Sequence, residues 1–202
     1  TNIQEVKKIV LRNWSFIVIG SISVVYWRIG NILISKTLTL NDVANYEISY
    51  KLFSMAEILP FIVSTSVFAL LISTLKTSKA NAFVIYKRVF MAYAAYGLFV
   101  FTFIFSFSEL LIPMLFGEKY SGIPMYCIEM FLTILLFPTA LLQANLLVAM
   151  KLEIMDMWFN AISLIINVIV CLIGLYYFKS LMVVNYAIFF SFLVFIKMSL
   201  AL

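Results

Sequence analysis

The feature that most constrains this chain is a series of long runs without charged residues. Three of them, at positions 89–108, 130–150 and 157–178, contain 20, 21 and 22 uncharged residues. A helix of about 20 apolar residues crosses the hydrocarbon core of a bilayer. Two shorter runs and a first run interrupted by a single arginine complete a set of six. The sequence therefore predicts six membrane spans, over about 14–36, 46–75, 88–112, 124–150, 157–178 and 181–202.

The composition agrees with a membrane protein and excludes a soluble domain. Hydrophobic residues make up 65% of the chain, charged residues make up 11%, and the mean hydropathy is +1.11. We predict an all-α polytopic bundle that includes residues 1–202 as one unit, since the connections are too short to hold a soluble domain. The sequence begins with Thr1 instead of Met and stops at Leu202 inside an apolar run. We therefore expect it to be part of a longer protein.

The distribution of lysine and arginine predicts the orientation. Nine cations lie on the side of the N-terminus and four on the other side, with one arginine left inside the membrane. Because cytoplasmic loops carry an excess of lysine and arginine, we predict that the N-terminus is cytoplasmic. The basic segment from Lys76 to Arg88 could be read as a nucleic-acid patch. Because two spans flank it, we interpret it as a cytoplasmic loop beside anionic lipid headgroups, with no nucleic-acid partner. The predicted location is the bacterial inner membrane, with several crossings.

Arg28 is the charged residue within the first span. A charged side chain at that depth costs roughly 2.5 to 3.5 kcal/mol on insertion scales, so it normally faces a partner or a wet cavity. Three interpretations stay open. Arg28 pairs with Glu57 and joins two helices; it extends to the outer headgroups near Lys36; or, with Lys51, it lines a cavity and binds an anionic substrate.

The pairing with Glu57 follows from the hairpin formed by the first two spans. If the chain turns near Thr39 to Asn41, Arg28 lies between Lys51 and Glu57 in height. Glu57 is then the charge partner of Arg28 or, as the acidic residue deepest in the bundle, an ion-coupling group.

Two prolines inside predicted spans mark possible hinges. Pro60 lacks a backbone N–H, so one carbonyl of its helix loses its donor. The hydroxyls of Ser64, Thr65 and Ser66, which follow Pro60, could donate to that carbonyl instead. Pro138 gives the fourth span a similar weak point. Kinks of this kind would let helices rock during transport.

Nothing in the sequence predicts an enzyme, a metal site or a cofactor. The chain has no histidine, and Cys127 and Cys171 lie singly in apolar runs without the paired spacing of metal ligands. Paired carboxylates at a catalytic spacing and a glycine-rich phosphate loop are also missing. We interpret the protein as a transporter without catalytic residues.

Four segments, in order along the chain, resemble one family. They are Tyr26-Trp27-Arg28-Ile29 followed by Ile32-Leu33-Ile34, Asp42-Val43-Ala44-Asn45-Tyr46 with Tyr50-Lys51-Leu52, Leu115-Phe116-Gly117-Glu118-Lys119-Tyr120, and Ile165-Ile166-Asn167-Val168. This order is similar to that of the bacterial polysaccharide flippases, which move O-antigen or other lipid-linked oligosaccharides and belong to the multidrug/oligosaccharidyl-lipid/polysaccharide exporter superfamily. Members often carry an aspartate where this chain has Gly30, and a glycine where it has Ala44.

The resemblance implies a role for the whole chain. It would form the second, C-terminal lobe of a two-lobe transporter that moves a polyprenyl-diphosphate-linked oligosaccharide to the outer leaflet for surface polysaccharide biosynthesis. Its partners would be that substrate, membrane lipids and either the missing N-terminal lobe or a second copy. Two alternatives remain: an ion-coupled exporter of the same superfamily, and a membrane-embedded glycan-processing enzyme.

Overall fold

The structure is a computed structural model that describes residues 3–120 and 122–201, and these residues form helices and short connections without strands. In chain order the helices are α1 (Ile3–Arg12), α2 (Trp14–Thr37), α3 (Leu40–Thr77), α4 (Lys79–Phe116), the 3₁₀ turn η1 (Glu118–Tyr120), α5 (Pro124–Phe131), the 3₁₀ segment η2 (Leu132–Leu135), α6 (Phe137–Ala149), α7 (Glu153–Phe178) and α8 (Met182–Leu200).

Six helical segments are long and apolar enough to cross a membrane, as the uncharged runs predicted. They are α2, α3, α4, the combined segment Pro124–Ala149, α7 and α8. Large apolar side chains such as Val24, Phe99 and Ile173 are exposed on the outside of the bundle. In a bilayer these side chains face lipid, which is as apolar as they are, so the exposed surface is what a membrane-spanning bundle requires.

Short polar turns connect the helices and fix their ends. Thr39 begins α3 with a capping box, because its hydroxyl accepts from the Asp42 amide while the Asp42 carboxylate accepts from the Thr39 amide. Ser78 ends α3 and also caps α4, accepting from the Asn81 amide at 3.3 Å. These single-residue and two-residue connections keep α2, α3 and α4 adjacent along the chain.

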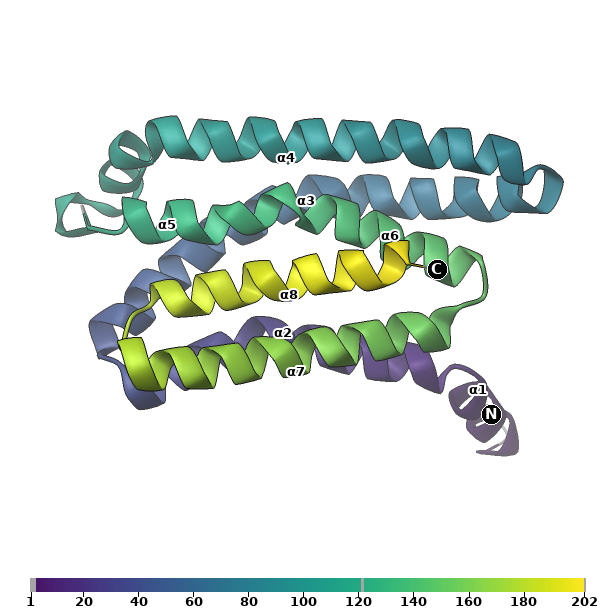
Figure 1. Cartoon of the computed structure of the whole chain (residues 1–202), viewed down its shortest axis with the longest axis horizontal. Helices are drawn as coiled ribbons and strands as arrows, with labels where there is room; N and C mark the ends of the chain where they lie inside the picture. Colours follow the sequence, from purple (N-terminus) through teal and green to yellow (C-terminus); the bar gives the residue numbers. More distant parts are fainter. Residues whose placement is uncertain (1–2, 121, 202) are drawn as a thin grey trace.

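The six spans run roughly along one axis, so the connections gather at two ends (Figure 1). One end holds both termini, the α3–α4 turn and the α6–α7 connection; the other holds the α2–α3, α4–α5 and α7–α8 connections. The end with the termini carries Lys76, Lys79 and Lys151. Since α3 and α4 have 38 residues each, their length is about 57 Å, well above the roughly 30 Å hydrocarbon core. Both helices therefore extend beyond the membrane core.

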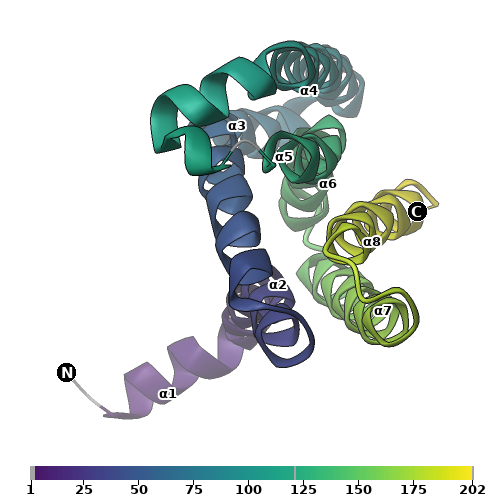
Figure 2. The ribbon, with the colours of Figure 1, turned by 90° about the vertical axis from the view of Figure 1, so that its left-hand side faces the viewer.

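Viewed end-on, α3 runs from α2 to α4, α5 and α6 lie between α3 and α8, and α7 lies beside α2 (Figure 2). The amphipathic helix α1 projects away from this bundle (Figure 2). The largest group of buried apolar residues contains side chains from α2 through α8, and includes Ile34, Phe53 and Cys171. The bundle interior is thus shared by helices from both halves of the sequence.

Pro60 lies inside a continuous α3, but its neighbouring hydroxyls do not take the role that we expected of them. Proline has no N–H, so the carbonyl of Ala56 loses its donor within the helix. The donor comes from α4: Tyr96 Oη donates to Ala56 O at 2.6 Å, and Tyr93 Oη donates to Pro60 O at 3.1 Å. Two of the three hydroxyl residues named above are engaged elsewhere: Thr65 donates to Ile62 O, and Asn145 donates to Ser64. The expectation failed because a phenol on a neighbouring helix can reach this carbonyl.

A candidate substrate cavity in the bundle

A cavity of about 590 Å³ lies within the membrane-spanning bundle. Its walls come from α2, α3, α6, α7 and α8, so it depends on helices that are far apart in the sequence. Apolar and aromatic side chains form most of the wall, and a few polar groups interrupt it. This combination is typical of small-molecule sites. The polar lining residues in the described chain are Ser23, Arg28, Glu57, Asp156, Asn160, Ser163 and Ser191, together with Tyr26 and Tyr50.

Arg28 lines the cavity, and its closest charge partner is Glu47, not Glu57. The two charged groups are 3.7 Å apart, and the Arg28 side chain is 60% exposed. Its guanidinium carbon also lies 5.9 Å from the centre of the Tyr50 ring, within cation–π range. Asn31, one turn further along α2, donates to the same Glu47 carboxylate.

Of the three interpretations of Arg28, the pair with Glu57 is wrong, because the turn lies earlier than we assumed. Only residues 38 and 39 separate α2 from α3. Arg28 therefore lies ten residues before the turn and Glu47 eight residues after it, at nearly equal height along an antiparallel hairpin. Glu57 lies eighteen residues after the turn, about 12 Å or more beyond Arg28 along the axis.

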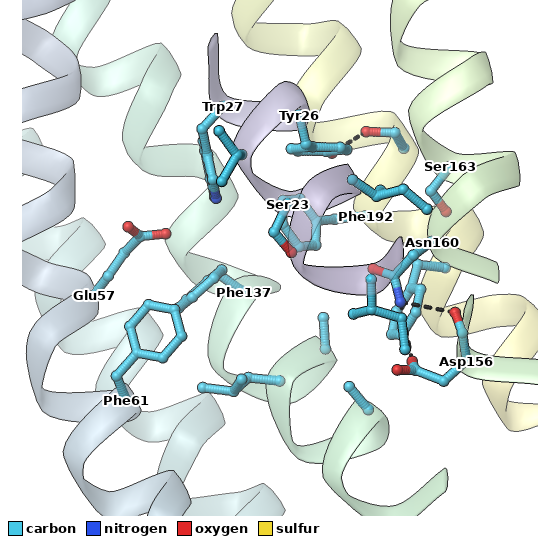
Figure 3. Close-up of a pocket in the computed structure, with 18 of the residues that line it drawn as sticks. Ser23, Tyr26, Trp27, Glu57, Phe61, Phe137, Asp156, Asn160, Ser163 and Phe192 are labelled. Atoms are coloured by element: carbon cyan, nitrogen blue, oxygen red, sulfur yellow. Dashed lines mark hydrogen bonds between the residues drawn. The ribbon is translucent and has the colours of Figure 1, made fainter. Parts of the chain in front are cut away.

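Glu57 lies on the α3 side of the same cavity, buried to 6% exposure. Its Oε1 atom has no hydrogen-bond partner among the described residues. In Figure 3 the Glu57 side chain extends from α3 toward Trp27, with Phe61 on the same helix below it. An unpaired buried carboxylate oxygen is costly, so this group is a strong candidate for contact with a ligand.

Asp156 faces the cavity from α7, on the opposite side from Glu57 (Figure 3). It is 2% exposed, and Asn160 Nδ2 donates to its Oδ1 at 3.0 Å. Sequence reasoning missed this pair because Asp156 was read as the charge that ends a span. The available signal was the spacing of four residues, which places an acid and an amide on one face of a helix.

The remaining predicted site residues are distributed differently. Lys51 is exposed on α3 and is not among the residues that line the cavity. Pro60 and Pro138 are both buried, the first inside α3 and the second in the first turn of α6. The structure therefore brings Arg28 and Glu57 to one cavity, and leaves Lys51 outside it. Within the described residues, no group of three or more His, Cys, Asp or Glu could hold a metal ion.

The chain is thus a multi-pass α-helical membrane protein with a polar-lined cavity among its spans. A sequence profile for the family described as polysaccharide biosynthesis protein matches residues 1–124. The chain belongs to this family, and it has a role in polysaccharide biosynthesis or export. Searches of curated proteins and of solved structures found no match.

Proposed function

We propose that this chain forms one lobe of a flippase that moves a polyprenyl-diphosphate-linked oligosaccharide across the bacterial inner membrane. The observation that carries the proposal is the cavity among α2, α3, α6, α7 and α8 in a member of a polysaccharide biosynthesis family. A membrane-embedded cavity with an accessible guanidinium suits a substrate that has both a charged diphosphate and a glycan. The second lobe would come from another part of the protein or from a second copy.

In this proposal Arg28 binds the diphosphate. Arginine presents several N–H donors in a fixed plane and holds phosphate oxygens in pairs. The Glu47 carboxylate and the Tyr50 ring hold the guanidinium in place from one side, and its 60% exposure leaves donors free for a ligand. Lys51 follows Tyr50 on α3 but lies outside the cavity, so its contact with substrate would occur at entry or exit. In the proposed orientation, the N-terminus of the chain lies on the cytoplasmic side of the membrane.

Alternating access requires helices of the bundle to bend, and we propose that they bend at Pro60 and Pro138. At Pro60, α3 lacks one hydrogen bond of its own and depends on a hydroxyl from α4. Just before Pro138, the span changes from α5 through η2 to α6. Discontinuous helices of this kind commonly line the binding sites of transporters. Pro60 and Pro138 would therefore act as hinges on two walls of one cavity.

The test uses a bacterial strain whose surface polysaccharide depends on this protein. Arg28→Ala should abolish surface polysaccharide and cause lipid-linked oligosaccharide to accumulate, while the amount of protein in the membrane stays unchanged. Lys36→Ala is the matched control, because Lys36 is an exposed cation in the last turn of the same helix and does not line the cavity. Wild-type polysaccharide in the Arg28→Ala strain would contradict the proposed role of Arg28.

An ion-coupled exporter is the second candidate, favoured by the buried Oε1 atom of Glu57, which has no partner among the described residues. A carboxylate that binds and releases a cation within the membrane could couple transport to an ion gradient. Glu57→Gln removes the charge and keeps the shape. If Glu57 is the coupling group, transport by this variant in vesicles no longer responds to an imposed ion gradient. A gradient response equal to that of the wild type would assign Glu57 to another role.

A further inference from the structure

Asn160 is the polar side chain of α7 whose orientation in the cavity is fixed from within its own helix. Its Nδ2 atom donates to the backbone oxygen of Asp156 at 2.8 Å and to Asp156 Oδ1 at 3.0 Å. A backbone carbonyl oxygen only accepts hydrogen bonds, so the nitrogen of the amide must face it. The Asn160 Oδ1 atom therefore points the other way, and Figure 3 shows it on the side of Ser23 in this view. It accepts no hydrogen bond from the described residues.

The hold on Asn160 does not depend on the charge of Asp156. A carboxyl group keeps an oxygen that accepts a hydrogen bond whether the group is ionised or protonated. The second acceptor, a backbone oxygen, never titrates. Asp156 is 2% exposed, and one of its oxygens is used by Asn160. The two residues thus present a single fixed acceptor to the cavity, the Asn160 amide oxygen.

Two serine hydroxyls lie beside this acceptor on the cavity wall. Ser163 is one turn after Asn160 on α7, it is 4% exposed, and its Oγ atom has no partner among the described residues. Ser23 comes from α2, which packs along α7, and forms no hydrogen bond within the described part of the chain. Native proteins pair nearly all their buried polar atoms, so the Ser163 hydroxyl indicates contact with something outside the chain.

Ser23 and Asn160 lie at similar heights in the bundle. Ser23 is nine residues after Trp14, where α2 begins, and Asn160 is seven residues after Glu153, where α7 begins. Both helices begin at the end that holds the termini (Figure 1). The hydroxyl and the amide oxygen can therefore contact one small group between the two helices.

Aromatic rings form the apolar part of the wall next to these polar groups. Trp27, one turn after Ser23 on α2, has a ring contact with Phe192 of α8 at 6.0 Å, and Phe192 has another with Tyr26 at 5.3 Å. The rings brace one another, so their positions are fixed before a ligand binds. Rigid rings beside hydrogen-bonding groups fit a sugar, which has apolar C–H faces and a rim of hydroxyls.

We propose that Ser23, Asn160 and Ser163 form a subsite for the sugar next to the diphosphate, with Asp156 as the positioning residue for Asn160. The inference rests on the proposed function, because it concerns the glycan of the same substrate. Arg28 lies five residues after Ser23, about 7.5 Å further along α2. The diphosphate and the sugar are therefore bound by different groups of one cavity, and their contributions to affinity can be measured separately.

The experiment measures binding to the whole chain in lipid nanodiscs. The chain has three tryptophans, and Trp14→Phe with Trp158→Phe leaves Trp27, in the cavity wall, as the fluorescent reporter. The probes are farnesyl diphosphate and the same molecule with one glucose on its terminal phosphate. Two added hydrogen bonds to the sugar correspond to about tenfold tighter binding of the glucosyl probe.

Variants then test which residues cause this preference. Asn160→Leu should bring the two affinities to within about twofold of each other. Arg28→Ala should weaken both probes by a similar factor and keep their ratio. Asn145→Leu is the matched control, because it is the same substitution in another wall helix, but Asn145 donates to Ser64 and does not line the cavity. This control should keep the tenfold preference.

Two substitutions of Asp156 separate positioning from charge. Asp156→Asn retains an oxygen that can accept from Asn160, so the preference should stay close to tenfold. Asp156→Leu removes that acceptor and leaves only the backbone oxygen to hold the amide, so the preference should fall about threefold. If Asn160→Leu fails to fold, Ser23→Ala should lower the preference by a similar factor.

The outcomes separate this inference from the proposed function. Equal binding of both probes to the reporter chain, weakened by Arg28→Ala, overturns the sugar subsite and leaves the proposed function standing. A preference that survives both Asn160→Leu and Ser23→Ala overturns the roles of those residues. A preference lost in Arg28→Ala contradicts the separation of the two sites. Binding of neither probe overturns the subsite and the proposed function together.

Discussion

Two membrane spans each contain a proline, Pro60 and Pro138, yet the backbone around the two prolines differs. The helix α3 runs through Pro60 without interruption from Leu40 to Thr77. At Pro138 the span is divided: α5 ends at Phe131, a 3₁₀ segment follows, and α6 begins at Phe137. Part of the difference is the position of each proline: Pro60 lies in the interior of α3, whereas Pro138 lies in the first turn of α6, where the missing N–H costs no hydrogen bond within the helix.

The neighbouring helix α4 also differs at the two prolines. Next to Pro60 it supplies Tyr96, whose hydroxyl replaces the missing donor to Ala56 O. Next to Pro138 it supplies Gly97, and a Cβ atom at that position would lie 2.6 Å from Ile134 O. Here α4 approaches the backbone of η2 directly instead of donating to it. A proline in a membrane span therefore has to be read together with its position in the helix and with the groups that the neighbouring helix places beside it.

Gly97→Ala should have the largest effect on this comparison. The added methyl group would overlap a backbone carbonyl that cannot rotate away, so α4 and η2 must separate. We expect unfolding free energy in an SDS titration to fall by about 2 to 3 kcal/mol. Gly20→Ala is the control, since nothing lies within 4 Å of its added Cβ and alanine favours a helix by up to about 1 kcal/mol over glycine. Equal stability of the two variants would show that α4 does not press on η2.

Tyr96→Phe should have the next largest effect. It removes the only replacement donor that the structure shows for Ala56 O, leaving a partly buried carbonyl without a partner in the described chain. The expected loss is about 1 to 2 kcal/mol in the same titration.

A double-mutant cycle tests this explanation. In a Pro60→Ala background, residue 60 has its own N–H for Ala56 O, so Tyr96→Phe should lose most of its cost. An unchanged cost in that background would mean that Tyr96 stabilises the bundle by packing and not by replacing the proline's missing donor.

Tyr93→Phe should have the smallest effect of the three. Tyr93 Oη donates to Pro60 O, but in a continuous helix that carbonyl is already the acceptor for the amide of residue 64. Losing a second donor should cost about 0.5 kcal/mol, close to the mean for polar contacts between membrane helices. A loss as large as that of Tyr96→Phe would contradict the distinction between a freed carbonyl and a shared one.

Much of the architecture could be predicted from the sequence. Uncharged runs of about 20 residues have few solutions in a bilayer, because every backbone group must be bonded within its own segment. The six spans followed from this requirement. Arg28 could also be recognised, since a charge inside an apolar run needs an environment that supplies water or a partner.

The candidate site could be predicted only in part. Arg28 and Glu57 both line the cavity, but the partner of Arg28 is Glu47, because a shift of about two residues in the turn changes the height of every later residue on α3. Asp156 was assigned to the end of a span, and no local pattern could show that α7 returns beside α2. Contacts between helices far apart in sequence have no signature in either segment alone.

The sequence by itself determined that the chain is a bundle of six membrane helices, because apolar length and the absence of charge limit what a bilayer accepts. Only the tertiary structure decided which polar groups meet: two carboxylates and an arginine around one cavity, and tyrosines of α4 beside Pro60 in α3. The physical reason is that lipid drives each helix into the membrane separately, whereas close packing and hydrogen bonds between helices determine their neighbours.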